Sequence, residues 1–369
     1  MPVLAAVLAL VVLAIVLWDA FETILLPRRV PHRIRLSRIV LRVLWTLWAL
    51  IARRLERSAK RENFLSLYAL LSLIVLLVVW ALGLVFGFAT LYWAFGSKMS
   101  GSAPNGFFTD LYLSGTTLFT LGIGDVTPDA TAERLVVVIE AGMGFGFLAM
   151  VIAYVPVLYQ SFSRREARIT MLDEWAGSPP SAGVILRRCF ESRTPGAALD
   201  RLLQEWELAA SEMLESHLSY PILAYFRSQH DNQSWLASLS AILDTCAVVI
   251  SGVEGIDPFQ ARLTFAIARH MLVDVSQNLA LRRAFESDEI HSLADIRELK
   301  SWLAAAGVAL DHGTDADQKL LELRRAYVPY VRVLSELLFT PMPSLLPPPK
   351  VRYNWETTAW ARTGRADAH

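Results

Sequence analysis

The stretch that decides the fold reads Phe107-Phe-Thr-Asp-Leu-Tyr-Leu-Ser-Gly-Thr-Thr-Leu-Phe-Thr-Leu-Gly-Ile-Gly-Asp-Val-Thr-Pro128. Residues 107–119 are predicted to form a short apolar helix, which Thr120-Leu-Gly-Ile-Gly-Asp125 follows directly. The alternating glycines permit backbone with φ > 0, so successive carbonyl groups can point toward one axis. Non-helical backbone at membrane depth is tolerated only where it lines a cavity. A lone Gly-x-Gly also marks ordinary tight turns, so the flanking sequence must decide between a pore and a turn.

Two apolar stretches flank this segment. Leu65–Phe95 carries no charge, and Leu135–Phe162 carries only Glu140. Each is long enough to cross a bilayer, which takes about 20 residues. Basic residues precede the first stretch and follow the second, so the positive-inside rule places both distant ends in the cytoplasm. The segment between them is therefore predicted to be re-entrant from the outside, which favours a pore over a turn.

This arrangement resembles the two-transmembrane pore module of the potassium-channel superfamily, bacterial type, over about residues 65–165 and most strongly at Tyr112–Pro128. The resemblance implies K+ sites formed by carbonyls, together with the Thr120 hydroxyl and an acid at the extracellular mouth. The residues implied are Thr120, Leu121, Gly122 and Ile123 for the ion, with Gly124 completing the selectivity filter and Asp125 at the mouth.

Two residues depart from the family pattern. Ile123 stands where the family usually has tyrosine, and Phe119 stands where threonine is common. Isoleucine cannot donate the hydrogen bond with which that tyrosine braces the filter from behind. Potassium selectivity is the favoured expectation because related channels accept other apolar residues there, and a weakly selective cation channel is the alternative.

The motif occurs once in the chain, and one filter strand cannot encircle an ion. A closed ring therefore needs several subunits, and the resemblance implies a homotetramer gated at the bundle of inner helices. The candidate gating hinge comprises Gly142, Gly144, Gly146 and Pro156. Gly144 is the first choice by its distance from the filter, whereas close helix packing is the alternative use of these glycines. Pro156 is expected to kink the helix because it removes a backbone donor.

Three acids fall within apolar segments: Asp19, Glu22 and Glu140. An acid inside a span is a functional candidate by default. Glu140 is predicted to brace the pore helix or filter through Thr116 or Thr117, with a purely structural buried acid as the alternative. Asp19 and Glu22 are expected to pair with Arg28, Arg29 or Arg42 and so to tie the first span to the next helix.

The N-terminal part contains one further span, Val3–Leu26. No positive charge precedes it and no small-residue cleavage site follows, so a signal peptide is not expected. Basic residues follow it, which places the N-terminus outside. Residues 34–55 form a basic amphipathic helix that is expected to lie in the cytoplasmic interface against anionic lipid, with a spanning position as the alternative. Voltage sensing is not expected, because no arginine-rich span exists.

From about residue 166 the composition is that of a soluble protein. An amphipathic helix is marked by Leu199, Leu202, Leu203, Trp206, Ala210, Met213 and Leu214, and Thr194-Pro195 and Asp257-Pro258 are predicted helix starts. Further helical patterns lie near 234–251, 258–286, 292–306 and 317–339, and no strand pattern of useful length occurs. Nucleotide, metal and catalytic motifs are missing, so no cofactor and no enzymatic activity are expected. Ligand binding, docking of a partner and support of assembly remain open.

Composition agrees with a membrane protein: of 369 residues, 54% are hydrophobic and 19% charged, and the mean hydropathy is +0.39. The balance of 35 basic and 35 acidic residues argues against a nucleic-acid binder, and two cysteines cannot build a disulfide framework. Residues 1–170 hold 16 basic and 10 acidic side chains, whereas the rest holds 19 and 25. The zero total therefore hides a basic membrane half and an acidic soluble half.

The predicted fold is an all-α membrane protein with a potassium-channel-like pore module, an extra N-terminal span and interfacial helix, and an α-helical cytoplasmic domain. The predicted divisions are 1–62 for the N-terminal helices, 63–165 for the pore, 166–340 for the helical domain and 341–369 for a Pro-rich tail. The predicted function is potassium-selective passive conduction in a bacterial plasma membrane. The alternative from another class is a membrane-anchored interaction or sensor protein with a non-conducting pore module.

Overall fold

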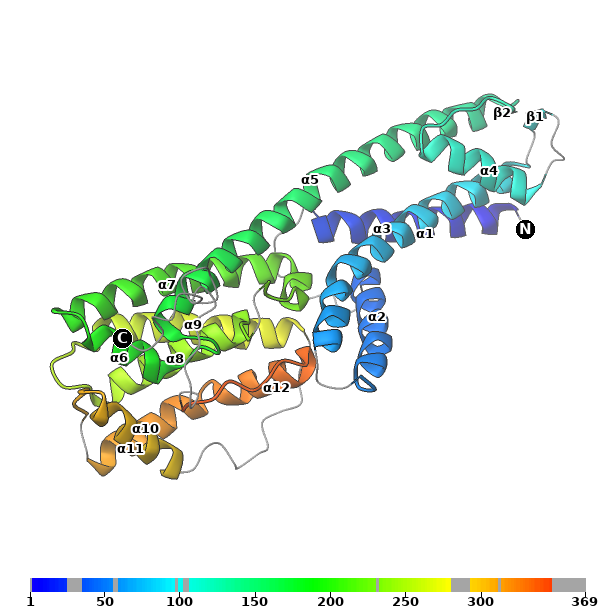
Figure 1. Ribbon diagram of the computed structural model, residues 1–369. Coiled ribbons are helices and arrows are strands. Elements are labelled where there is room, and N and C mark those ends of the chain that lie inside the picture. The colour runs from blue at the N-terminus through cyan, green and yellow to red at the C-terminus, as the bar shows by residue number, and fades with distance from the viewer. Residues whose placement is uncertain are drawn as a thin grey trace, which may run out of the picture. The chain divides into compact units, whose positions relative to one another are not determined.

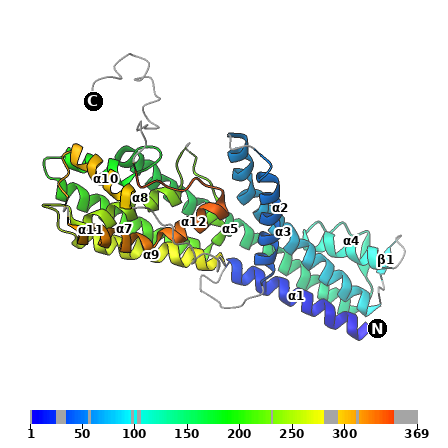
Figure 2. The ribbon, with the colours of Figure 1, turned by 90° about the horizontal axis from the view of Figure 1, so that it is seen from below.

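The computed structural model describes residues 2–24, 35–55, 59–96, 99–101, 106–229, 232–279, 293–310 and 313–346. They divide into two compact units, residues 1–160 and 161–369, and each is described by itself. Helices make up most of both units in Figures 1 and 2. The strands of the described ranges are β1 (Met99–Gly101) and β2 (Val126–Pro128), which pair antiparallel with Ser100 opposite Thr127.

In the first unit, α1 (Pro2–Ile24) packs against the second half of α3 (Ala59–Phe95), and Figures 1 and 2 both show them side by side. Two glycines four residues apart on α3 make the close approach possible. A Cβ at Gly83 would lie 2.8 Å from a methyl group of Val16, and one at Gly87 would lie 2.7 Å from a methyl group of Leu13. Small residues at this spacing let helix backbones approach closely in lipid, so α1 is seated on α3 by shape.

A buried carboxylate fastens α2 (Leu36–Ala52) to both of these helices. Asp19 of α1 accepts hydrogen bonds from the Ser37 amide at 2.9 Å, the Ser37 hydroxyl at 3.0 Å and the Trp80 indole at 2.8 Å. The first amides of a helix lack partners within it, so Asp19 caps α2 from a neighbouring helix. Glu22 forms an ion pair with Arg35 at 3.0 Å.

The acids at the end of α1 therefore do tie α1 to α2, but not through the predicted arginines. Asp19 uses Ser37 and Trp80, and Glu22 uses Arg35. Arg42 is exposed, while Arg28 and Arg29 lie outside the described residues. The sequence predicted pairing of these acids with arginines, because opposite charges are visible in a sequence. The need of the first α2 amides for a hydrogen-bond acceptor is visible only in the structure.

The other contacts of α2 are aromatic and lie at the start of α3. Trp48 stacks on Phe64 with ring centroids 4.5 Å apart, and Trp45 meets Tyr68 edge-on at 4.6 Å. The opposite face of α2 exposes apolar side chains: Ile39, Val43, Leu47, Leu50 and Ile51. With 17 residues, α2 is not among the described helices that are long and apolar enough to cross a membrane.

The remaining elements of the first unit are α4 (Phe107–Leu118) and most of α5 (Thr131–Ala176). By length and composition, α1, α3, α5 and α8 (Trp235–Gly252) could each cross a membrane. Burial separates the last from the others. The apolar window of α8 is 89% buried, whereas that of α5 is 11% buried. α8 is thus the core helix of the second unit, and α1, α3 and α5 remain as the candidate spans.

The second unit is a helical bundle around α8. Its other elements are the end of α5, α6 (Ala182–Phe190), α7 (Pro195–Ser219), the short 3-10 helix η1 (Pro221–Tyr225), α9 (Phe259–Asn278), α10 (Leu293–Ala305), α11 (Thr314–Arg325) and α12 (Val328–Leu338). All residues of α8 from Trp235 to Ile250 are buried. A helix that is apolar on every side is stable only when surrounded, and α7 and α9 pack against it. The predicted amphipathic helix is α7, with its apolar residues inward.

Two sequence predictions for this unit need correction. The single helix expected over 317–339 is two helices, α11 and α12, separated at Ala326 and Tyr327. Pro329 in the first turn of α12 explains the break, because it lacks the N–H that a continuous helix would require. Asp257 does receive an N–H, from Phe259, but α9 begins at Phe259. The end of the 258–286 pattern and most of the Pro-rich tail lie outside the described residues.

A buried arginine of α5, Arg165, connects this helix to η1 and α7 in the second unit. Arg165 donates to the carbonyls of Leu223 and Phe226, each at 2.8 Å, and pairs with Glu166 at 3.1 Å. Its Nη1 also lies 3.4 Å from Nε2 of His217. Nδ1 of that ring is 2.8 Å from the Met213 carbonyl, which only accepts, so Nδ1 carries the proton and Nε2 accepts from Arg165.

We predict a pH-dependent stability from His217. Burial and the neighbouring Arg165 lower the pKa of His217 to about 3 from its ordinary value of 6.5. Between these pH values His217 is therefore protonated in the unfolded chain and neutral in the folded chain. The free energy of unfolding is at its full value above about pH 6.5 and falls below it, by up to roughly 1.4 kcal/mol per pH unit.

Urea unfolding followed by tryptophan fluorescence between about pH 7.5 and 4.5 measures this slope. His217→Gln keeps a donor for Met213 but does not titrate, so its slope is expected to be shallower by that amount. Equal slopes in the two proteins would contradict the assignment.

Candidate pore

α4 ends where the non-helical segment begins. Its buried face carries Leu113 and Leu118, which pack against α3, while Asp110, Ser114 and Thr117 are buried polar residues. Beyond Leu118 the chain folds back onto the last turn of the helix. The amides of Thr120, Leu121 and Gly122 donate to the carbonyls of Thr117 and Thr116, at 2.8 to 3.2 Å. The predicted short helix over 107–119 is confirmed to within one residue.

The segment 120–124 has an alternating backbone. Thr120, Gly122 and Gly124 have φ of +57°, +54° and +81°, whereas Leu121 and Ile123 do not have positive φ. Positive φ is easy for glycine and uncommon for threonine. Alternation of this kind allows successive carbonyl oxygens to face one side. Because the amides of residues 120–122 are used on α4, the opposite side is favoured for the carbonyls of these residues.

The Asp125 end of this segment is held by side chains from α4, β1 and α5. The Tyr112 hydroxyl donates to the carboxylate of Asp125 at 3.0 Å. Ser100 on β1 hydrogen-bonds to Asp129, and Arg134 donates to the Pro128 carbonyl at 3.0 Å. The β1–β2 ladder joins the loop after α3 to the strand that follows Asp125. Asp125 is exposed at this end in the single chain.

Glu140 of α5 is fully buried and joins three helices. Its carboxyl lies 2.5 Å from the Ser114 hydroxyl of α4 and receives a hydrogen bond of 2.6 Å from the Tyr92 hydroxyl of α3. Glu140 therefore contacts the pore helix, but through Ser114 rather than the predicted Thr116 or Thr117. The Thr116 hydroxyl donates to a carbonyl of its own helix instead.

The glycines of α5 differ in their surroundings. A Cβ at Gly144 would lie 2.1 Å from the carbonyl oxygen of Leu118, closer than any side chain can stand. Gly142 and Gly146 have nothing within 4 Å of such an atom. Of the two uses considered, the structure supports close packing at Gly144, and a hinge remains a prediction. Pro156 lies inside α5, which continues beyond it to Ala176.

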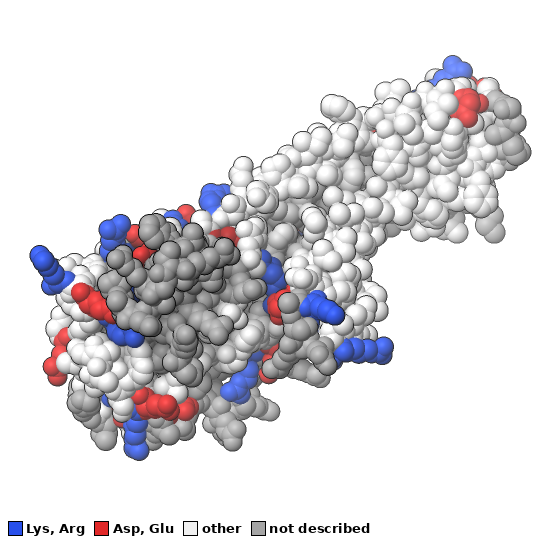
Figure 3. Space-filling view, viewed as in Figure 1, with Lys and Arg blue, Asp and Glu red and all other residues white. Residues whose placement is uncertain are grey.

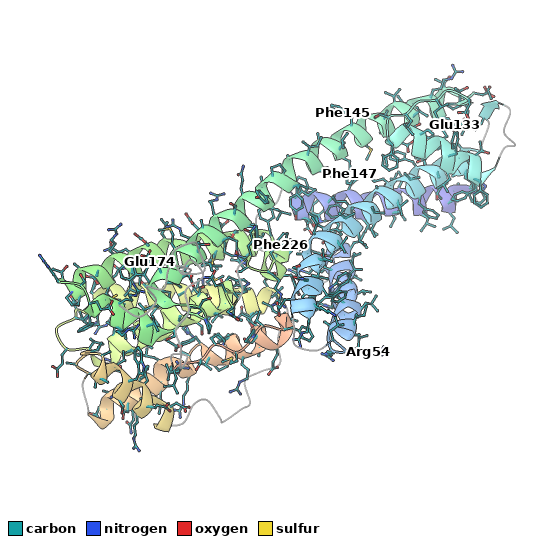
Figure 4. The ribbon with its side chains drawn as sticks, in the orientation of Figure 1. Arg54, Glu133, Phe145, Phe147, Glu174 and Phe226 are labelled. Atoms are coloured by element: carbon teal, nitrogen blue, oxygen red, sulfur yellow. The ribbon has the colours of Figure 1, made fainter. Side chains whose placement is uncertain are left out.

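One side of this site is open in the single chain. Leu121 and Ile123 are 65% and 61% exposed, although both are large and apolar. On α5, Phe147 points toward the other helices of the unit and Phe145, 69% exposed, points away from them (Figure 4). In Figure 3 the visible face of this unit between α2 and the end that carries β1 and β2 is almost free of charge, and charged side chains lie near α2 and near that end. The single chain thus leaves an apolar surface uncovered at the loop and along α5.

Acidic side chains do not converge on a metal site here. Among the described residues, no group of three or more His, Cys, Asp or Glu side chains is placed to hold an ion. Asp19 and Glu22 lie at the α1–α2 junction, so the three predicted intramembrane acids fall into two separate sites.

Three functional candidates were missed from the sequence: Tyr92, Tyr112 and Ser114. Tyr92 and Ser114 carry buried hydroxyl groups in apolar helices, which is a signal in itself, because a buried hydroxyl needs a partner, whereas Tyr112 is exposed. Tyr112 precedes Asp125 by 13 residues, and only the fold-back of the chain after α4 brings the two together.

These features define a class: an all-α membrane protein in which a short re-entrant helix and a glycine-punctuated loop lie between two long apolar helices. Residues 72–160 match a family model described as "Ion channel". The matched stretch includes the second part of α3, α4, the loop and α5 up to the end of the first unit. Over residues 72–160, about a quarter of the chain, the sequence is therefore similar to the ion-channel family, and this match supports a pore module of the potassium-channel superfamily there. No curated protein and no solved structure matches the chain.

We predict that Gly144→Ala displaces α4 from α5 and abolishes current, because the added carbon would overlap the Leu118 carbonyl. Gly115→Ala in α4 is the control, because open space around the added carbon and the higher helix propensity of alanine, about 1 kcal/mol, favour tolerance there. Thermal unfolding and channel current of both variants measure the effect. Equal behaviour of the two variants would show that the close contact is unimportant.

Proposed function

We propose that the chain conducts K+ passively and selectively as a homotetramer, with a gate where the inner helices α5 converge. The observation that carries this proposal is the alternation of positive φ at Thr120, Gly122 and Gly124. Four such strands around one axis would stack rings of carbonyl oxygens that replace the hydration shell of the ion. The permeant ion is the only ligand in this proposal, and no cofactor takes part.

Charge supports a cation as the permeant species. Residues 107–128 contain two charged side chains, Asp110 and Asp125, and no basic one. α4 directs its C-terminal end toward the loop, and the C-terminal end of a helix carries partial negative charge. Carbonyl oxygens, the helix end and Asp125 all favour positive charge over negative charge.

The exposure of apolar side chains supports the tetramer. The apolar window of α5 is 11% buried, against 44% for the window of α3. Lipid covers some of this surface, but Leu121 and Ile123 belong to the re-entrant loop, where lipid-exposed irregular backbone does not occur. Neighbouring copies of α4 and α5 are the partners that we propose for these side chains, and fourfold symmetry closes the ring.

The end of α5 supports control of the gate by the helical domain. Ile169, Leu172 and Ala176, near the end of the same helix, belong to the hydrophobic core of the second unit. A change in that core therefore acts on the helix that carries Gly144 and Pro156. Gly142, Gly144, Gly146 and Pro156 remain the proposed positions of bending, with Gly144 now also required for packing.

We propose that α2 lies in the cytoplasmic interface of a bacterial plasma membrane, with the N-terminus outside and the second unit in the cytoplasm. Its exposed apolar face and its basic residues suit that depth and contact with anionic lipid. These basic residues are Arg35, Arg38, Arg42, Arg53 and Arg54. The basic residues on the proposed cytoplasmic side also support the orientation.

The main rival is a weakly selective cation channel, because Ile123 cannot brace the filter with a hydroxyl. Reversal potentials of the purified full-length chain in planar bilayers, with K+ on one side and Na+ on the other, separate the two. Selective conduction predicts a reversal potential that shifts by nearly 59 mV for each tenfold change in K+, the Nernst slope for one charge. Equal permeability of the two ions would refute selectivity, and silent bilayers would favour the sensor alternative.

We predict that Gly122→Ala destroys this conduction. Alanine at the φ of +54° seen for Gly122 is strained by about 1–2 kcal/mol in every subunit. Gly115→Ala is the matched control, because Gly115 lies within α4, with open space around the added carbon. The same bilayer recordings measure both. Wild-type current and selectivity in Gly122→Ala would show that this segment is not the selectivity filter.

A further inference from the structure

The inference concerns the buried junction behind the filter, formed by Val85, Tyr92, Ser114 and Glu140. Three oxygen–oxygen contacts link these four residues. The Ser114 hydroxyl lies 2.9 Å from the Val85 carbonyl and 2.5 Å from Oε1 of Glu140, and the Tyr92 hydroxyl lies 2.6 Å from Oε2. The residues come from α3, α4 and α5, so this junction connects the outer, pore and inner helices.

Counting hydrogens identifies the state of Glu140. Each contact needs one hydrogen between its two oxygens, so three are required. The Val85 carbonyl has none to give, and Ser114 and Tyr92 have one each. Tyr92 uses its hydrogen on Oε2, and Ser114 must use its own on Val85, which only accepts. The third hydrogen, between Ser114 and Oε1, has to come from the carboxyl group.

We propose that Glu140 is held as a neutral carboxylic acid that donates to Ser114, and that it acts as a positioning residue for the pore helix. This inference rests on the proposed function only for its effect on conduction. A carboxylate would leave two acceptors, Oε1 and the Val85 carbonyl, competing for the single Ser114 hydrogen in a buried site. The acid form satisfies every polar group of the junction.

The position of the junction explains what it does. Ser114 lies six residues before Thr120 on the helix whose last turn receives the amides of the filter segment. One turn further along α5, Gly144 brings that helix against the Leu118 carbonyl. The acid and the glycine therefore hold α4 at two points. Ile123 offers no hydroxyl to brace the filter, and this junction fixes the filter through its supporting helix.

Glutamine is the diagnostic replacement, because its amide group donates to Ser114 and its carbonyl accepts from Tyr92. Glu140→Gln is expected to keep the unitary conductance and reversal potential of the wild-type channel. Glu140→Ala strands two buried hydroxyl groups and is expected to lower the current roughly tenfold or more. The proposal would be overturned if the wild type conducts but Glu140→Gln gives no current or no folded protein. A carboxylate at residue 140 would then be required.

Infrared spectroscopy of the purified full-length chain tests the proton directly and needs no current. The difference spectrum between wild type and Glu140→Gln is expected to contain the carbonyl stretch of one protonated carboxyl group at neutral pH. A carboxylate band in its place would overturn the inference. A wild-type protein that shows the acid band but no current would refute the proposed conduction and leave the neutral acid established.

Discussion

Backbone that leaves the helical conformation inside a membrane must have its polar groups satisfied, and this constraint governs the first unit. The amides of Thr120, Leu121 and Gly122 are satisfied by the last turn of that helix, which favours the other side for the carbonyls of these residues. The neighbouring contacts hold α4 in the position that these hydrogen bonds require. Glu140 and Gly144 join it to α5, Leu113 and Leu118 seat it on α3, and Tyr112 holds Asp125 at the outer end.

Glycine serves three separate purposes in this unit, and a sequence pattern cannot distinguish them. Gly122 supplies a positive φ, Gly144 makes room for a carbonyl group, and Gly87 makes room for a leucine side chain. Gly142, which has the same spacing as its neighbours, meets nothing in the single chain. The spacing of the glycines indicated that α5 bends or packs closely, but only the structure shows which glycine makes a close contact.

Sequence patterns predicted the spans, the pore helix and the helical character of the second unit, because apolar periodicity and charge reflect burial directly. They failed where a partner lies far along the chain. The cap that Asp19 gives α2 and the meeting of Glu140 with Ser114 both depend on how three helices cross. The division between α11 and α12 was recoverable, since Pro329 marks it in the sequence.

The apolar character of α8 has a consequence for biosynthesis. Its window has a mean hydropathy of 1.6, enough by length and composition to cross a membrane. In the second unit it is covered by its neighbours, chiefly α9 and α11. Both follow α8 in the chain, so α8 emerges before they have been translated, at about 5–20 residues per second. Until then the nascent chain holds an uncovered helix that by length and composition could cross a membrane.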